Sequence, residues 1–252
     1  MSPAKRAFRR KSAVVVSAAH AVAAAAGVEV PAGAEATEYE LLRAALGLDV
    51  RRLRDIQSVE RKIELKPELV EKYEPWIAGV LQADTGGHDD ILVQVMIWLI
   101  DIGAFARAMP LADYVLRHDL KLPERFNRTA ATLIVEEIAD AALKKLGAHQ
   151  DADIEALQRI EWIAAEHDMP DQVKAKLFKA IGLQIVRIVE GRPEEQLPAG
   201  GRRAGVERAL EYLRRGYGLS STAGVKKDID RLERELRKLT TAQAAEQQGE
   251  AQ

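Results

Sequence analysis

The sequence predicts an all-α protein. Alanine, leucine, glutamate, arginine and lysine, which all favour helices, dominate the 252 residues. Aromatic residues make up only 5% of the chain, and runs of the β-branched residues typical of strands are few. Apolar residues also recur at helical spacing along most of the sequence. Together these observations favour an N-terminal helical region followed by stacked antiparallel helix pairs.

The N-terminal region is expected to hold helices at residues 12–26, 38–46 and 48–65. The next helix is expected to begin at Pro67. Residues 28–37 contain Pro31 and Gly33 and are expected to form a linker. Gly47 lies between two of the helices and is expected to form a turn. Pro67 suits a first helical position, because a proline there gives up no intrahelical hydrogen bond.

The most distinctive stretch begins at Asp89. Ten of the fourteen residues from 89 to 102 are apolar, which is too many for one stripe, so this helix is expected to be buried on most sides. Asp89 and Asp90 stand where a helix N-terminus favours negative charge. Gly103 is expected to end the helix, and a second, amphipathic helix should run to His118.

The second half of the chain is expected to continue the helical pattern. The expected helices lie at about 129–146, 151–167, 170–190, 206–216 and 222–239. Residues 191–205 contain two prolines and four glycines and are expected to form a loop. Residues 95–120 and 206–236 both read as two helices joined by a short turn, a tetratricopeptide-like feature without a strict repeat. We therefore expect a helical region over residues 1–66, a helical-repeat-like core over 67–240 and a disordered tail over 241–252.

Composition excludes several classes of site. The chain has no cysteine, so disulfides and thiolate metal sites are excluded and a reducing cytoplasm is the expected compartment. The five histidines show no H-E-x-x-H spacing, and no G-x-x-x-x-G-K-[ST] loop is present. We therefore expect no metal, no other cofactor and no ATP hydrolysis by this chain. No segment reaches the roughly 18 apolar residues that span a membrane.

Positive charge is concentrated at the N-terminus. The first twenty residues carry five cations and no acid, whereas the whole chain has a net charge of −2. The five cations are Lys5, Arg6, Arg9, Arg10 and Lys11. Such a cluster can neutralise DNA phosphates, but it also fits a solubilising tail. With the apolar residues that follow it also resembles a signal peptide, although the alanine-rich stretch and His20 argue against that interpretation.

Two further groups of cations are weaker candidates. Arg51, Arg52 and Arg54 precede Arg61 and Lys62, and the helices around Gly47 could form a helix-turn-helix-like reader of DNA. On the residues alone a solvated helix face is the preferred interpretation of this group, because Asp55 and Glu60 dilute its charge. The other group contains Arg202, Arg203, Arg208, Arg214 and Arg215. Surface charge, partly paired with Glu207 and Glu211, is the preferred interpretation there.

Clustered carboxylates have to be weighed as a nuclease site, because a two-metal nuclease needs several convergent acids. The candidates are Asp89, Asp90, Asp101, Glu136, Glu137 and Asp140. Helix capping explains the first two, and Glu136 and Glu137 lie on the polar side of a helix, so we expect no intrinsic cleavage. Trp76, Trp98 and Trp162 lie on apolar helix faces and are expected to be core residues. In the last helix, apolar residues with 4-3-4-3 spacing could pack within the chain or against another subunit.

Three motifs together resemble a known family, the small terminase subunit of P2-like temperate tailed phages. They are the stretch from Asp89 to Glu137, D-M-P-D-Q-V-K-A-K-L at 168–177, and A-G-V-K-K-D-I-D-R-L-E-R-E-L at 223–236. The resemblance covers roughly residues 73–238. It implies an oligomer that recognises double-stranded viral DNA in the host cytoplasm and delivers it to the large subunit, which carries the ATPase and nuclease.

The sequence departs from this family in two places. Relatives can end in a strongly basic tail, whereas this chain ends neutral to acidic, so the N-terminus and Arg51, Arg52 and Arg54 become the expected DNA contacts. The loop at 191–205 resembles an insertion. Some family members carry the label "endonuclease subunit", which leaves an endonuclease component as an alternative. The other alternative is a helical scaffold that binds only protein.

Overall fold

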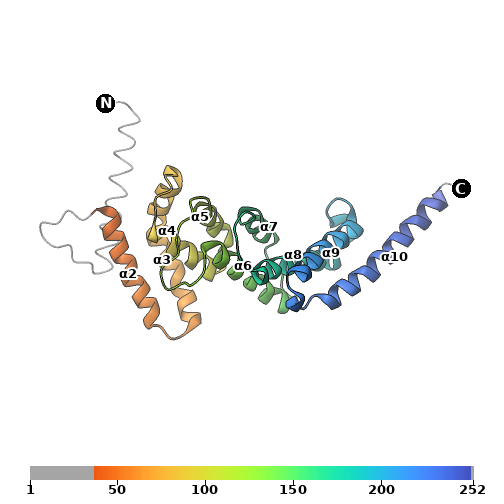
Figure 1. Ribbon diagram of the computed structural model, residues 1–252, viewed down its shortest axis with the longest axis horizontal. Helices are drawn as coiled ribbons and strands as arrows, with labels where there is room; N and C mark the ends of the chain where they lie inside the picture. Colours follow the sequence, from red (N-terminus) through yellow and green to blue (C-terminus); the bar gives the residue numbers. More distant parts are fainter. Residues whose placement is uncertain (1–36, 251–252) are drawn as a thin grey trace, which may run out of the picture. The chain divides into compact units, whose positions relative to one another are not determined.

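The computed structural model describes residues 37–250, with side chains as far as Thr241 (Figure 1). Within that range the regular elements are helices and no strand occurs, which confirms the predicted all-α class. The tetratricopeptide-like stacking stays a prediction. The helix expected at 12–26 and most of the linker at 28–37 lie outside the described residues. Among the described helices, none combines the length and apolar character needed to cross a membrane.

The chain divides between Asn127 and Arg128 into two compact units. The first described unit contains α2 (Glu38–Asp55), α3 (Val59–Ala83), α4 (Asp90–Asp101) and α5 (Phe105–Arg117). As expected, residues 91–100 of α4 are all buried, because α2, α3 and α5 pack around this helix. Gly103 adopts a φ of 72° between α4 and α5 and so ends the apolar run as predicted.

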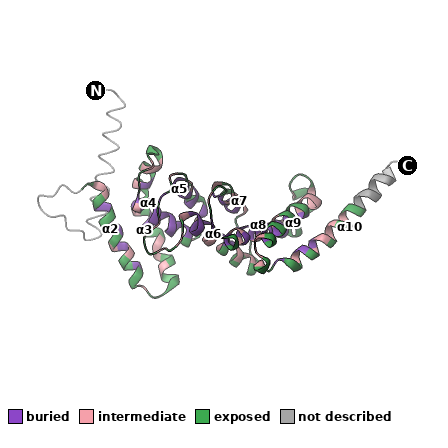
Figure 2. Cartoon of the chain, viewed as in Figure 1, coloured by how far each residue is buried: buried purple, intermediate pink, exposed green. Residues whose placement is uncertain are grey.

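Side-chain caps fix where these helices begin. Thr37 and Glu40 form a capping box at the start of α2, in which the Glu40 carboxylate accepts from the Thr37 backbone N–H at 2.7 Å. Ser58 caps α3 by accepting from the N–H of Arg61. Figure 2 shows buried and exposed residues alternating along α2, as an amphipathic helix requires.

Two predicted breaks do not occur. α2 runs through Gly47, which lies on an exposed face of the helix, so the predicted helix-turn-helix around this glycine is wrong. α3 runs through Pro67 and Pro75, so Pro67 does not begin a helix and the predicted boundary after residue 66 falls inside α3. Both prolines are exposed, as are Ile63 and Glu71, whose carbonyls lose their helical partner and can bond water instead.

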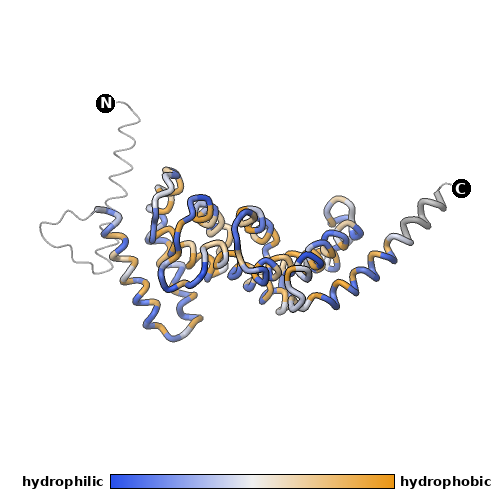
Figure 3. Tube along the Cα trace, in the orientation of Figure 1, coloured by the Kyte–Doolittle hydropathy of each residue, from blue (hydrophilic) through white to orange (hydrophobic). Residues whose placement is uncertain are grey.

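The second unit contains α6 (Ala130–Gly147), α7 (Ile154–Ile163), α8 (Asp171–Gly191), α9 (Gly201–Leu219) and α10 (Lys226–Glu250). Two short 3-10 turns, η1 (Glu194–Gln196) and η2 (Ser221–Ala223), precede α9 and α10. α8 lies at the centre and packs against α6, α7 and α9, while α10 packs against α9. Polar and apolar residues alternate along α10 (Figure 3), and Val225, Ile229 and Leu232 are buried.

Two expectations for this unit need correction. The loop expected at 191–205 is shorter, because α9 already begins at Gly201. Gly200 and Gly201 adopt positive φ, and the Glu194 carboxylate accepts from the backbone N–H of Arg202 at 2.9 Å, which starts the helix early. α10 also continues to Glu250, whereas a tail without regular structure was expected after Thr240.

Glycines let α8 and α9 approach closely. A Cβ added to Gly182 of α8 would lie 2.7 Å from Leu213 Cδ2, and one added to Gly216 of α9 would lie 3.2 Å from the carbonyl oxygen of Ala175. Both glycines are buried. Small residues at these positions therefore set the distance between the two helices.

Candidate nucleic-acid interface

The five N-terminal cations lie outside the described residues. The predicted contacts Lys5, Arg6, Arg9, Arg10 and Lys11 therefore have no structural account, and their role stays a prediction.

The structure does place the second group of cations. Arg51, Arg52 and Arg54 are exposed at the end of α2, and buried Leu53 fixes this turn to the unit. Residues 56–58 connect α2 to α3, so that Arg61 and Lys62 lie at the same end of the helix pair (Figure 1). We call these five cations the basic tip: Arg51, Arg52, Arg54, Arg61 and Lys62. Within the described residues none of their side chains forms an ion pair, which leaves them available to a ligand.

The basic tip is a favourable place for phosphate contacts. Cations near a helix C-terminus also interact favourably with the helix dipole, so Arg52 and Arg54 are compatible with the last turn of α2. Two large apolar side chains are exposed beside the cations, Val59 at 70% and Ile63 at 41%. The tip therefore presents both charge and apolar area on one surface, and it lies at the turn of residues 56–58 and not at Gly47.

The acids of the first unit have structural partners. The buried carboxylate of Asp89 caps α4 by accepting from the N–H groups of Ile91 and Leu92, both at 2.9 Å, and from Trp76 Nε1 at 2.8 Å. Asp90 pairs with Arg43 at 2.6 Å and with His88, and Asp101 pairs with Lys66 at 2.6 Å. Each carboxylate therefore serves capping or pairing in the fold.

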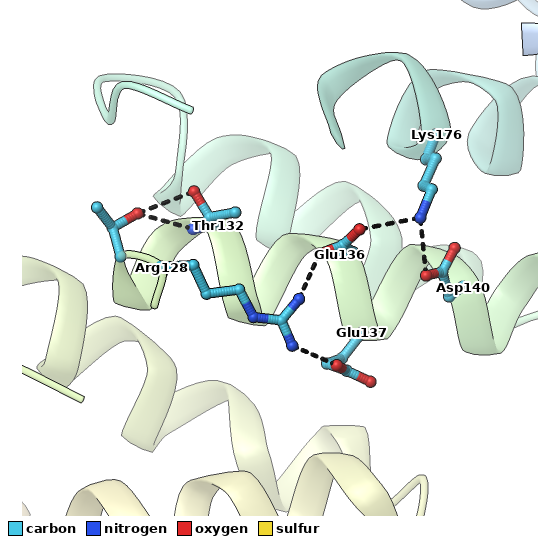
Figure 4. A network of polar contacts seen from close by, with 7 residues as sticks. Arg128, Thr132, Glu136, Glu137, Asp140 and Lys176 are labelled. Carbon is cyan, nitrogen blue, oxygen red and sulfur yellow. Dashed lines mark hydrogen bonds and ion pairs between the residues drawn. The ribbon is translucent and has the colours of Figure 1, made fainter. Parts of the chain in front are cut away.

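The three candidate acids of the second unit, Glu136, Glu137 and Asp140, form one network with two cations (Figure 4). Arg128 binds Glu136 and, at 2.6 Å, Glu137, which ties the start of the unit to α6. Lys176 of α8 reaches Glu136 at 3.0 Å and Asp140 at 2.9 Å. The hydrogen bond from Lys176 lowers the pKa of Glu136. Burial alone would lower the pKa of Lys176, but its bonds to Asp140 and Glu136 outweigh this effect and raise it.

This network leads to a prediction for Lys176→Met. Because the pKa of Glu136 is lowered on folding, the pair stabilises the fold fully above the ordinary glutamate pKa, and the stabilisation is lost as pH falls through the folded-state value. At pH 7 we expect the variant to lose about 1 kcal/mol of unfolding free energy, and the loss should shrink below about pH 4. Urea unfolding at both pH values measures it.

A matched control is Lys174→Met on the same helix, because the structure describes no ion pair for Lys174. We expect its change to stay within about 0.5 kcal/mol at either pH. A loss for Lys176→Met that does not depend on pH would contradict the ion-pair explanation.

Among the described residues, no group of three or more histidine or acidic side chains is arranged to hold a metal ion. Asp89, Asp90 and Asp101 belong to the first unit, whereas Glu136, Glu137 and Asp140 belong to the second. Within each unit, the acids are engaged by caps and cations.

The arginines of α9 are mostly paired, but with other partners than expected. Arg203 does pair with Glu207, at 2.9 Å, as the sequence indicated. Arg214 instead pairs with Glu233 of α10 at 2.7 Å, and Arg215 approaches Glu161 of α7 at 3.7 Å. These contacts support the interpretation as surface charge.

The three tryptophans have different environments. Trp98 is buried, as predicted, and its ring lies near that of Tyr73. Trp76 is half-buried with its indole N–H bonded to Asp89. Trp162 is 68% exposed, so its assignment to the core is wrong. The buried stripe of α7 is formed by Ala156, Leu157 and Ile160, and Trp162 lies about 200° around the helix from Ile160.

Comparisons with known proteins identify the family. Residues 43–172, about half of the chain, match the family described as phage small terminase subunit. The "Terminase, endonuclease subunit" of Escherichia phage P2 is 38% identical over 236 residues, which cover 94% of this chain and 86% of that protein. The "Probable terminase, endonuclease subunit" of Haemophilus phage HP1 is 23% identical over 77% of this chain and 69% of its own length. No solved structure matches the chain. The chain therefore belongs to the phage small terminase subunit family and is a component of a terminase that packages phage DNA.

Proposed function

We propose that this chain is the DNA-recognition subunit of the terminase. In this proposal it binds double-stranded viral DNA in the host cytoplasm and delivers it to the large subunit, which supplies ATP hydrolysis and cleavage. The observation that carries the proposal is the basic tip, whose four exposed arginines and half-buried Lys62 form no ion pair within the described residues. Cations that neutralise DNA phosphates release condensed counterions, which favours binding to any sequence.

The two basic segments have different tasks in this proposal. Lys5, Arg6, Arg9, Arg10 and Lys11 have no acid nearby in sequence and contact phosphates. Arg51, Arg52 and Arg54 stand on a helix fixed by buried Leu53, so they can hold a defined register against base edges. A homo-oligomer would present several such tips at once, and the joint attachment would raise the affinity.

The proposal predicts how DNA binding responds to salt. If about five phosphates are neutralised by each subunit, affinity should fall by roughly 2–3 decades between 50 and 200 mM salt. Replacing the five N-terminal cations by alanine should flatten this slope and weaken binding to every sequence alike. Replacing Arg51, Arg52 and Arg54 by glutamine should lower the slope by about 2–3 and also reduce any preference for the packaging sequence. Fluorescence anisotropy with labelled duplexes measures both.

The control removes three exposed cations elsewhere, Arg192, Lys227 and Lys238, for which the structure describes no ion pair. We expect this triple glutamine variant to keep the wild-type slope. Native mass spectrometry of the same samples gives the number of copies on the DNA. If all variants give the same affinity and slope, the chain does not recognise DNA through these residues, and a scaffold that binds only protein becomes the better account.

A further inference from the structure

A groove in the second unit has features that the fold itself does not require. It is lined mainly by α7, α8 and α9, with Val135 of α6, and has a volume of about 480 Å³. Its floor is apolar and buried and includes Val135, Met169, Leu177 and Phe178. A hollow of this size holds one or two large side chains of a ligand.

Trp162 stands at the edge of this groove with 68% of its surface exposed. The guanidinium of Arg159 lies 4.6 Å from the centre of the indole ring, so the side chain is held in place by a cation–π contact. A tryptophan gains nothing from such exposure in the isolated chain, whereas a ligand that covers it would bury a large apolar area.

The opposite side of the groove is formed by α9. The Tyr212 hydroxyl donates to Glu161 at 2.9 Å, and the Arg215 guanidinium lies over the Phe178 ring at 4.2 Å from its centre. Both side chains are therefore fixed before any ligand arrives. Arrangements of tryptophan, tyrosine and arginine around an apolar hollow are typical of the energetic centres of protein interfaces.

Charge restricts what the groove can accept. Three cations line it, Lys174, Arg208 and Arg215, against the single carboxylate of Glu161. That carboxylate is already engaged by Tyr212 and by Arg215 at 3.7 Å. A favourable occupant is therefore acidic.

We propose that this groove binds an acidic segment of another protein that inserts a large apolar side chain against Phe178 and Trp162. A protein segment is favoured over nucleic acid because the floor is apolar and buried. Duplex DNA keeps its bases stacked inside and offers phosphates but no apolar group to fill the floor. The proposal does not depend on DNA binding at the basic tip, which is in the other unit.

The test uses the full chain and a library of random 12-residue peptides displayed on yeast, selected for binding to the wild type. We expect enriched peptides to carry several acidic residues and at least one large apolar residue. A labelled peptide from this set should bind Trp162→Ala about 10-fold or more weakly, as expected for an interface centre. Arg208→Glu should also weaken binding, because it reverses one of the charges that attract the peptide.

Two control variants test whether changing any exposed aromatic or charged side chain weakens peptide binding. Tyr217→Ala removes an exposed aromatic side chain, on α9, that does not line the groove, and Arg192→Glu reverses an exposed charge outside it. Both should bind the peptide like the wild type, and circular dichroism should show all variants folded. Enriched peptides without acidic residues, or equal binding by Trp162→Ala, would overturn the proposal. So would a dT15 oligonucleotide that binds in a Trp162-dependent manner and displaces the peptide. Duplex DNA affinity should not change in Trp162→Ala, which separates this test from that of the basic tip.

Discussion

Replacing Gly182 by valine is expected to lower the free energy of unfolding by about 3 kcal/mol, because the new side chain overpacks a well-filled helix contact. A Cβ at this position would lie 2.7 and 2.8 Å from Cδ2 and Cγ of Leu213 and 3.3 Å from the carbonyl oxygen of Ala209. Leu213 is fully buried, so its side chain cannot move aside into solvent without leaving the core. The backbone oxygen can move only if α9 moves with it. The added methyl groups therefore force α8 and α9 apart.

The matched control is Gly218→Val, which adds the same side chain to α9 at an exposed position with no atom within 4 Å. Its unfolding free energy should change by no more than about 0.5 kcal/mol, and the better helix propensity of valine makes a small gain the expected sign. Urea unfolding followed by circular dichroism compares the two. Equal stability of both variants would mean that α8 and α9 are not in close contact at Gly182.

The sequence predicts helices well where one periodic pattern is sufficient. The apolar run after Asp89 and the break at Gly103 are in the structure because both depend on neighbouring residues in the chain. Gly47 and Pro67 were assigned as breaks from local preference, yet the helices continue through them. Propensity costs about 1 kcal/mol for a glycine and about 3 kcal/mol for a proline, and packing of the buried faces of α2 and α3 outweighs these costs.

The surroundings of the candidate sites were harder to predict, because they depend on contacts between distant residues. Arg43 and Asp90 are 47 residues apart, and Lys176 and Glu136 are 40 apart, so sequence spacing gave no sign of these pairs. Trp162 was assigned to the core because it was expected to lie on an apolar helix face, whereas α7 buries the face of Ala156, Leu157 and Ile160. The helical spacing of these three apolar residues would have indicated that Trp162 lies on the exposed face.

Asp89 gives the second large effect, because one buried carboxylate serves three donors. We expect Asp89→Ala to lose about 2–4 kcal/mol of unfolding free energy, since the cap of α4 is removed and the Trp76 indole N–H loses its partner. Asp89→Asn should lose less, because the amide oxygen can still accept from Ile91 and Leu92. Asp153→Ala, which removes an exposed cap with one bond at 2.9 Å to Ala156, should lose only about 1 kcal/mol. Thermal unfolding of the three variants measures the order.

The same variants decide whether Asp89 takes part in any cleavage, a question that the names of the relatives raise. If the carboxylate is only a helix cap, Asp89→Asn at a temperature where it is folded should behave like the wild type in a DNA-nicking assay with magnesium or manganese. Loss of nicking in Asp89→Ala alone would then reflect unfolding, because that variant lacks the cap. If wild-type protein nicks DNA and folded Asp89→Asn does not, Asp89 binds a metal ion, and the capping account given for it is incomplete. The asparagine variant separates the two explanations because it keeps the shape of the cap and removes the charge that a metal requires.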